Sequence, residues 1–343
     1  RCCGRSADQI MVSLLPDFFF VHIKIGLLRD IILKWHETER LGVITIRNRY
    51  LPVTVILIIV LIAFNPRIID LNHPGQAQYA ARNYELPDNI YLIFLKGLGC
   101  RYDGEPDDDY GYDAFINSLS KAGIPLDNEH LLLFSYRGGK IIEGRWVPEI
   151  FGSADTGQPI EWSVEKLAEL IERFSLAHPE ACYILVGHSL GGRIALDFAE
   201  TATDLLKKKI KGIITLNSPL VGVDDAPSVL LKSILNNSGT IWSSVAVNQI
   251  IWECGYWEEL AAKRRAALKD LQKDGVHIAT FSSDSDLLVR PISSCITDEK
   301  GKPVTDGFVI QDGYFSMEDI MGHMRILEDP YICQYIYSLY ANS

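Results

Sequence analysis

A five-residue motif between an apolar run and a helical segment limits the possible folds of this chain more than any other feature. Residues 182–186 have the length and the aromatic and β-branched content of a buried strand, and residues 192–199 suit a helix. Between them lies Gly187-His188-Ser189-Leu190-Gly191, a Gly-x-Ser-x-Gly pattern. We therefore predict a strand, a tight turn and a helix, with Ser189 at the turn.

The position of Ser189 indicates a nucleophile. The bare pattern would occur by chance in roughly one chain in ten of this length, so its placement carries the argument. At a strand-to-helix turn the serine is strained, and its hydroxyl projects at a helix N-terminus, where free N–H groups favour negative charge. The alternative is a Gly/Ser turn without chemistry.

A nucleophilic serine needs a base and an acid that orients the base. In proteins with this turn, the acid and then the histidine follow the serine along the chain. Six of the eight histidines precede or adjoin Ser189, and His277 opens the apolar, strand-like run 276–281. His323 is left as the candidate base. The alternative is a surface histidine or one at a helix start.

The acid is expected after the run 276–281, where two aspartates stand close together. We prefer Asp286, because its spacing to Val289 and Pro291 resembles the acid loop of many lipases and esterases. Asp284 is the alternative acid. Either residue could instead be a turn aspartate that caps its own backbone.

The oxyanion of an acyl-transfer intermediate needs two N–H donors. One is the main-chain N–H of Leu190, directly after the nucleophile. For the other we choose Leu98, in the Gly-rich turn Lys96-Gly97-Leu98-Gly99 that follows the apolar run 90–95. Many proteins with this turn have His-Gly where this chain has Lys96-Gly97.

Other ligand classes find little support in the sequence. Tyr102 stands where a dinucleotide-binding glycine pattern would need its third glycine, and no phosphate-binding loop motif occurs. Histidines and cysteines do not cluster at metal-ligand spacing, and the acidic run 107–109 lacks the rest of a calcium loop. The net charge of −11 disfavours nucleic acid. We therefore predict no metal, cofactor or nucleic-acid partner, and no obligate protein partner is evident.

From about residue 86 to residue 340 the chain resembles the α/β-hydrolases of the lipase and esterase type. Apolar runs at 131–136 and 210–216 and a segment of helical spacing at 160–174 agree with that order of elements. The resemblance implies an α/β fold with a doubly wound, mostly parallel sheet, and a catalytic domain over residues 86–343.

A long insertion separates the run 210–216 from the run 276–281. We predict that residues 222–275 form a helical lid, with Trp242, Trp252 and Trp257 as candidate substrate contacts. These side chains could equally pack the lid onto the core. The glycine-rich loop 137–159, which carries Trp146, is a second candidate for the pocket wall.

Residues 1–85 form an N-terminal extension of different character. The stretch 51–64 is uncharged and apolar, but it is shorter than the roughly 20 residues that span a bilayer comfortably. An uncleaved membrane anchor and a signal-type segment are both open, and a buried helix is the alternative. Basic residues before the stretch predict a catalytic domain outside the cytoplasm, anchored or secreted, with a cytoplasmic location as the alternative. Outside the cell, Cys295 and Cys333 could form a disulfide.

These observations predict a serine hydrolase that cleaves carboxylic esters through an acyl-enzyme on Ser189. Ester or lipid-like acyl groups are the expected substrates, as a lipase or carboxylesterase would take. The same residues would serve an acyltransferase, a thioesterase or an amidase. A non-catalytic binding protein of the same fold is the alternative outside enzymes.

Overall fold

The structure is a computed structural model, and it describes residues 88–104, 112–121, 130–222, 241–286, 288–311 and 322–342. The chain divides into two units, Arg1–Arg67 and Ile68–Ser343, and all described residues belong to the second. The predicted anchor at 51–64 and the rest of the N-terminal extension lie outside the described residues. Within the described ranges, no helix is long and apolar enough to cross a membrane.

The core of the second unit is a six-stranded sheet in the order β2-β1-β5-β6-β7-β8. Every neighbouring pair is parallel. The strands are β1 (Ile90–Leu95), β2 (Leu131–Leu133), β5 (Cys182–His188), β6 (Ile210–Leu216), β7 (His277–Ser283) and β8 (Val309–Ile310). Strands β1, β5 and β6 are buried almost throughout, which agrees with their predominantly apolar sequences.

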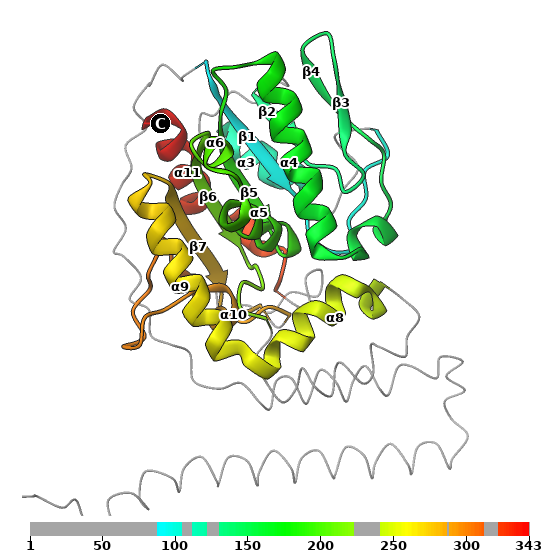
Figure 1. The fold of residues 1–343 in the computed structure, drawn as a ribbon. Helices are drawn as coiled ribbons and strands as arrows, with labels where there is room; N and C mark the ends of the chain where they lie inside the picture. The colour runs from blue at the N-terminus through cyan, green and yellow to red at the C-terminus, as the bar shows by residue number, and fades with distance from the viewer. Residues whose placement is uncertain are drawn as a thin grey trace, which may run out of the picture. The chain divides into compact units, whose positions relative to one another are not determined.

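Helices cover both faces of this sheet (Figure 1). One face packs against α4 (Ile160–Ala177), α5 (Leu190–Thr201) and α9 (Trp257–Lys273). The other packs against α3 (Tyr112–Lys121) and α11 (Pro330–Asn342). The shorter helices are α6 (Asp204–Lys207), α8 (Val245–Trp252), α10 (Pro291–Ser294), η1 (Ser153–Gly157), η2 (Ile241–Ser243), η3 (Glu253–Tyr256) and η4 (Arg325–Glu328). The predicted α/β architecture with a parallel sheet is confirmed.

The loop expected at 137–159 contains an antiparallel hairpin, β3 (Gly139–Ile142) and β4 (Arg145–Pro148). Trp146 of this hairpin is buried, and its indole N–H donates to the carbonyl of Leu133 at 2.9 Å. Trp146 therefore fastens the hairpin to the end of β2. Its placement gives no support to the prediction that it lines a substrate pocket.

The described helices of the insertion between β6 and β7 lie in two different places. Helix α9 covers the sheet, since Leu268 and Leu271 are buried in the core between α5 and β7. This half of the predicted lid is therefore an ordinary sheet-covering helix. Helix α8 lies at the end of the sheet toward which the arrowheads of β1 and β7 point (Figure 1). Residues 223–240 of the insertion lie outside the described ranges.

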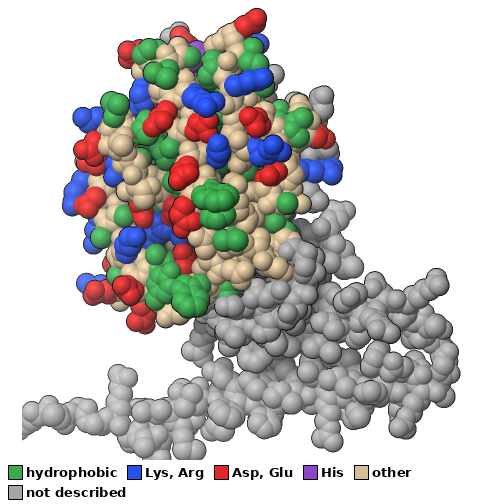
Figure 2. Space-filling view, turned by 45° about the vertical axis from the view of Figure 1, so that its right-hand side comes forward, with side chains coloured by type: hydrophobic (Ala, Val, Ile, Leu, Met, Phe, Trp, Pro, Cys, Tyr) green, Lys and Arg blue, Asp and Glu red, His purple; other side chains and the backbone are tan. Residues whose placement is uncertain are grey.

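The charged side chains are distributed without a dominant sign over the face shown in Figure 2. Acidic and basic groups alternate there, with apolar side chains gathered in separate patches. This face therefore offers no continuous basic surface of the kind that nucleic acid needs.

The suggested disulfide is wrong for this structure. Cys295 and Cys333 are both buried free thiols. The Cys295 thiol instead faces the carbonyl of Thr280, with 3.9 Å between sulfur and oxygen.

Candidate active site

The turn between β5 and α5 has the geometry of a nucleophile elbow. Ser189 has φ 54° and ψ −126°, a left-handed backbone conformation that costs a non-glycine residue energy. Its hydroxyl caps none of the first N–H groups of α5 within the described chain. A Cβ on Gly187 or on Gly191 would collide with main-chain atoms of Gly192 or Leu95, respectively. The tight turn therefore requires glycine at both places and leaves the serine hydroxyl at the helix start.

Loops from two distant parts of the chain bring Asp286 and His323 together. Asp286 follows β7, and its Oδ2 lies 2.6 Å from Nδ1 of His323. The ring centroid of His323 lies 4.7 Å from that of His188, the residue directly before the elbow serine. The Asp286–His323 pair therefore stands beside the nucleophile elbow.

Asp286 is held in one orientation inside the protein. It is buried, and its Oδ1 accepts hydrogen bonds from the N–H groups of Leu288 and Val289 at 2.8 and 2.9 Å. Burial raises the pKa of this carboxyl, while the imidazole and the two N–H donors act in the opposite direction. By contrast, the main-chain N–H of Asp284 bonds the carbonyl of Ile310 beside β8. The carboxylate on the histidine is thus that of the preferred candidate, Asp286.

The turn after β1 lies directly against Ser189. A Cβ placed on Gly97 would come within 2.7 Å of Cβ and 3.2 Å of Oγ of that serine. Within the described part of the chain, the N–H groups of Leu98 and Leu190 have no acceptor. Both candidate oxyanion donors therefore come from segments that meet at the serine.

Two residues that the sequence did not reveal hold this turn in place. The hydroxyl of Thr156, in η1, accepts the N–H of Gly99 at 2.8 Å and donates to the Ser153 carbonyl at 2.7 Å. The phenol of Tyr136 donates to the Lys96 carbonyl at 2.7 Å. Nothing in the spacing of either residue indicates such a contact.

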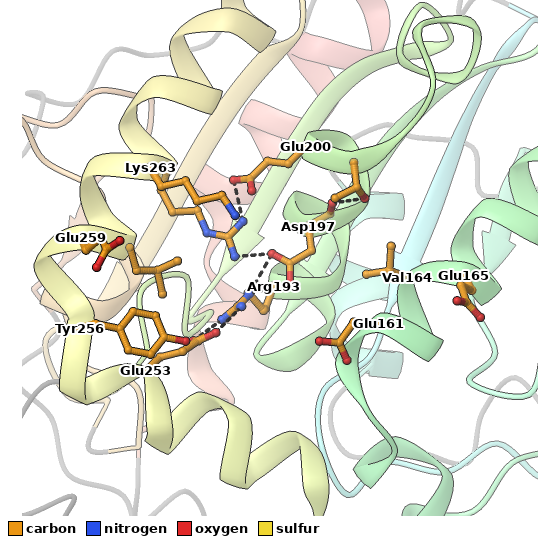
Figure 3. Close-up of a pocket in the computed structure, with 13 residues that line it drawn as sticks. Glu161, Val164, Glu165, Arg193, Asp197, Glu200, Glu253, Tyr256, Glu259 and Lys263 are labelled. Carbon is orange, nitrogen blue, oxygen red and sulfur yellow. Dashed lines mark hydrogen bonds and ion pairs between the residues drawn. The ribbon is translucent and has the colours of Figure 1, made fainter.

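A buried cluster of charges joins α5 to the insertion between β6 and β7 (Figure 3). Arg193 lies one turn after Ser189 and donates two hydrogen bonds of 2.6 Å to the carboxylate of Glu253. It also forms an ion pair with Asp197. Arg264 of α9 binds Asp197 as well. Burial alone would raise the pKa of Asp197, but the two guanidinium groups outweigh it and lower that pKa. A cavity of about 770 Å³ borders this cluster.

The three tryptophans predicted as substrate contacts lie in different surroundings. Trp257 packs partly against the core beneath α9, and Trp252 is 71% exposed. The side chain of Trp242 lies outside the described part of the structure. Neither of the two described placements supports a substrate contact.

One segment of the chain matches a known family in sequence. A family model of the alpha/beta hydrolase fold matches residues 145–249, which include β5, the elbow, α5 and β6. The matched segment and the parallel strand order both agree with an α/β-hydrolase fold.

Several solved structures are similar to part of the chain at low sequence identity. They include a lipase-esterase related protein from Clostridium acetobutylicum, with 14% identity over 73% of this chain and 94% of that one, at a TM-score of 0.41. A carboxylesterase structure from Nitrososphaera gargenis has 14% identity, coverage of 75% and 93%, and a TM-score of 0.42. The monoacylglycerol lipase of Paleococcus ferrophilus has 15% identity, coverage of 75% and 97%, and a TM-score of 0.37. No curated protein sequence matches the chain significantly. At these scores the likenesses add nothing to what the family model and strand order show.

Proposed function

We propose that this protein is a serine hydrolase that cleaves carboxylic esters. The observation that carries the proposal is the 2.6 Å contact between Asp286 and His323 beside the strained Ser189. A serine esterase needs an acid beside a histidine and the histidine beside a serine, because the acid orients the base and the base activates the serine. A binding protein of the same fold has no need of such an arrangement.

Each group has a defined task in the proposed reaction. Ser189 Oγ attacks the ester carbonyl while Nε2 of His323 takes its proton, and the carbonyl oxygen becomes an oxyanion. The Leu98 and Leu190 N–H groups stabilise that charge, each by about 3–4 kcal/mol in the transition state. The intermediate then collapses, and the alcohol leaves with the proton from the imidazole. This leaves an acyl group on the serine.

Water completes the cycle on the acyl-enzyme. His323 takes a proton from the water, the resulting hydroxide attacks the acyl carbonyl, and the carboxylic acid leaves as Oγ regains its proton. Asp286 remains ionised and stabilises the imidazolium in both halves. The nature of the acyl acceptor separates this reaction from acyl transfer, and the leaving group separates it from thioesterase or amidase chemistry.

The direct test is labelling with a fluorophosphonate, which reacts readily with an activated serine. We expect one adduct, located on Ser189 by peptide mass spectrometry, and none in the Ser189→Ala variant. A folded wild-type protein without an adduct, or a Ser189→Ala variant that labels equally, would overturn the nucleophile assignment.

A second measurement defines the substrate class. Hydrolysis of p-nitrophenyl esters from acetate to palmitate, with and without a competing alcohol, reports chain-length preference and acyl transfer. A lipid-directed enzyme should prefer long chains presented at an interface. A clear preference for short, dissolved esters would place the protein among carboxylesterases instead.

A further inference from the structure

The main-chain carbonyl of His323 accepts hydrogen bonds from two buried side chains. Nε2 of His188 and Nδ2 of Asn217 each lie 3.0 Å from this oxygen. His188 is 2% exposed and Asn217 is fully buried. His323 itself stands before η4 in a loop without regular structure, so these two bonds tie it to the ends of β5 and β6.

His188 is suited to act as a fixed donor. Burial first, and the neighbouring His323 second, lower the pKa of its imidazole to about 3, so the ring stays neutral near pH 7. A neutral imidazole that donates through Nε2 carries no proton on Nδ1. Among the described residues, Nδ1 of His188 has no hydrogen-bond partner. His188 is therefore a donor to the loop rather than a second base.

Asn217 links three parts of the site through one side chain. It directly follows β6, with a left-handed backbone at φ 46°. Its Oδ1 accepts the N–H of Ser283 at 2.9 Å, while its Nδ2 donates to the His323 carbonyl. Its own N–H bonds the Phe281 carbonyl at 3.0 Å. The residue thus fixes the histidine loop against the strand that precedes Asp286.

We infer that His188 and Asn217 are positioning residues, which hold the His323 backbone so that its imidazole reaches Ser189. The inference rests on the proposed serine hydrolase function. Asp286 fixes the ring through Nδ1, but a ring held only at that atom can still move with its backbone. Two donors on the carbonyl fix the backbone as well, and small misplacements of a base are costly in rate.

The competing explanation is that the two side chains only satisfy a buried carbonyl. Loss of either would then lower stability, without a specific effect on the chemistry of His323. The two explanations differ when His323 is absent. A positioning residue can contribute nothing once the group that it positions is gone.

The experiment measures the second-order rate of fluorophosphonate labelling in the full chain. We expect His188→Leu and Asn217→Ala each to slow labelling by about 10–100-fold. His188→Gln supplies an amide N–H in place of the imidazole N–H and should restore the rate to within about threefold. For ester hydrolysis, kcat should fall while KM changes by less than about threefold.

The same substitutions are then made in a His323→Ala protein. We expect the residual labelling rate to stay within about twofold of the His323→Ala parent. A similar fractional loss in both backgrounds, or wild-type labelling by both folded single variants, would overturn the inference. Asn217→Ala provides the test if His188→Leu does not fold. A wild-type protein that is not labelled at all would contradict the proposed function instead, so the two failures are distinguishable.

Discussion

At the residue scale, the two neighbouring aspartates give a matched pair of variants. Asp286→Asn keeps the shape of the side chain but removes the charge that stabilises an imidazolium. We expect kcat to fall by about 10³–10⁴-fold, because an amide also favours the wrong tautomer of the base. Asp284→Asn should stay within about threefold of wild type. Steady-state ester hydrolysis measures both, and a larger loss in Asp284→Asn would reverse the assignment of the acid.

His188 also makes the folded state sensitive to acid. Its ordinary pKa is 6.5, whereas burial and the adjacent His323 lower it to about 3 in the folded protein. Between pH 6.5 and pH 3 the His188 side chain binds a proton in the unfolded chain but not in the folded protein. The free energy of unfolding therefore decreases as the pH falls below 6.5. At pH 5 the loss amounts to about 2 kcal/mol.

The His188→Gln variant isolates this contribution, because glutamine does not titrate. We expect the free energy of unfolding to drop between pH 7.5 and pH 5 by about 2 kcal/mol more in wild type than in the variant. Urea denaturation at both pH values measures it. His323 and Asp286 are unchanged in the variant, so the difference between the two proteins reports on residue 188. Equal drops would show that His188 can be protonated in the folded state.

The sequence predicted the residues that perform the proposed chemistry better than those that support them. Ser189 and His323 follow from a motif and from chain order, and Asp286 follows from its spacing to an apolar anchor. Asn217 and Thr156 act through contacts with residues far away in the chain, which no local pattern encodes. The sequence contains one indication of the role of Asn217, which is that it is the first polar residue after a buried strand.

At the element scale, the buried charge cluster connects α5 to the insertion between β6 and β7 through ion pairs. Glu253 lies in η3, while its partner Arg193 lies on α5. Glu253→Gln would leave a buried guanidinium without its full countercharge. We expect the free energy of unfolding to fall by about 3 kcal/mol. Glu258→Gln, at an exposed position nearby, should change it by less than about 0.5 kcal/mol.

Urea denaturation of the two variants at pH 7.5 makes the comparison. The effect of Glu253→Gln should also persist in 1 M salt, since buried pairs are screened far less than exposed ones. A loss that disappears in salt, or one equal to that of Glu258→Gln, would mean that the insertion is held mainly by apolar packing.

Elements were predicted well where burial imposes a long apolar run. Strands β1, β5, β6 and β7 and helices α4 and α5 all lie close to their expected ranges. β8 has two residues and the hairpin strands have four each, which is too short for a periodic signal. We predicted that α9 belongs to a lid because the connection between the runs 210–216 and 276–281 is long, yet the apolar face of α9 is that of a sheet-covering helix.

At the scale of the whole molecule, every described part of the candidate site belongs to one unit. The turn after β1, the elbow, the acid loop and the histidine loop all meet at the carboxyl edge of the sheet, within Ile68–Ser343. This convergence is the usual outcome of a doubly wound sheet, since the loops after its parallel strands emerge at one edge. The proposed chemistry therefore requires only this unit.

A shortened chain that begins at Ile68 tests whether the second unit alone is sufficient for the proposed chemistry. We expect this shortened chain to be labelled by fluorophosphonate at a rate within about twofold of the full chain, because both core clusters are intact. Its far-ultraviolet circular dichroism should be that of a folded α/β protein. Expressed in cells and extracted with alkaline carbonate, the full chain should sediment with membranes and the shortened chain should not. The residues removed include the apolar segment 51–64, which we predict to be the anchor. A shortened chain that still sediments would assign membrane attachment to the surface of the second unit. A full chain that stays in the supernatant would show that the anchor prediction is wrong.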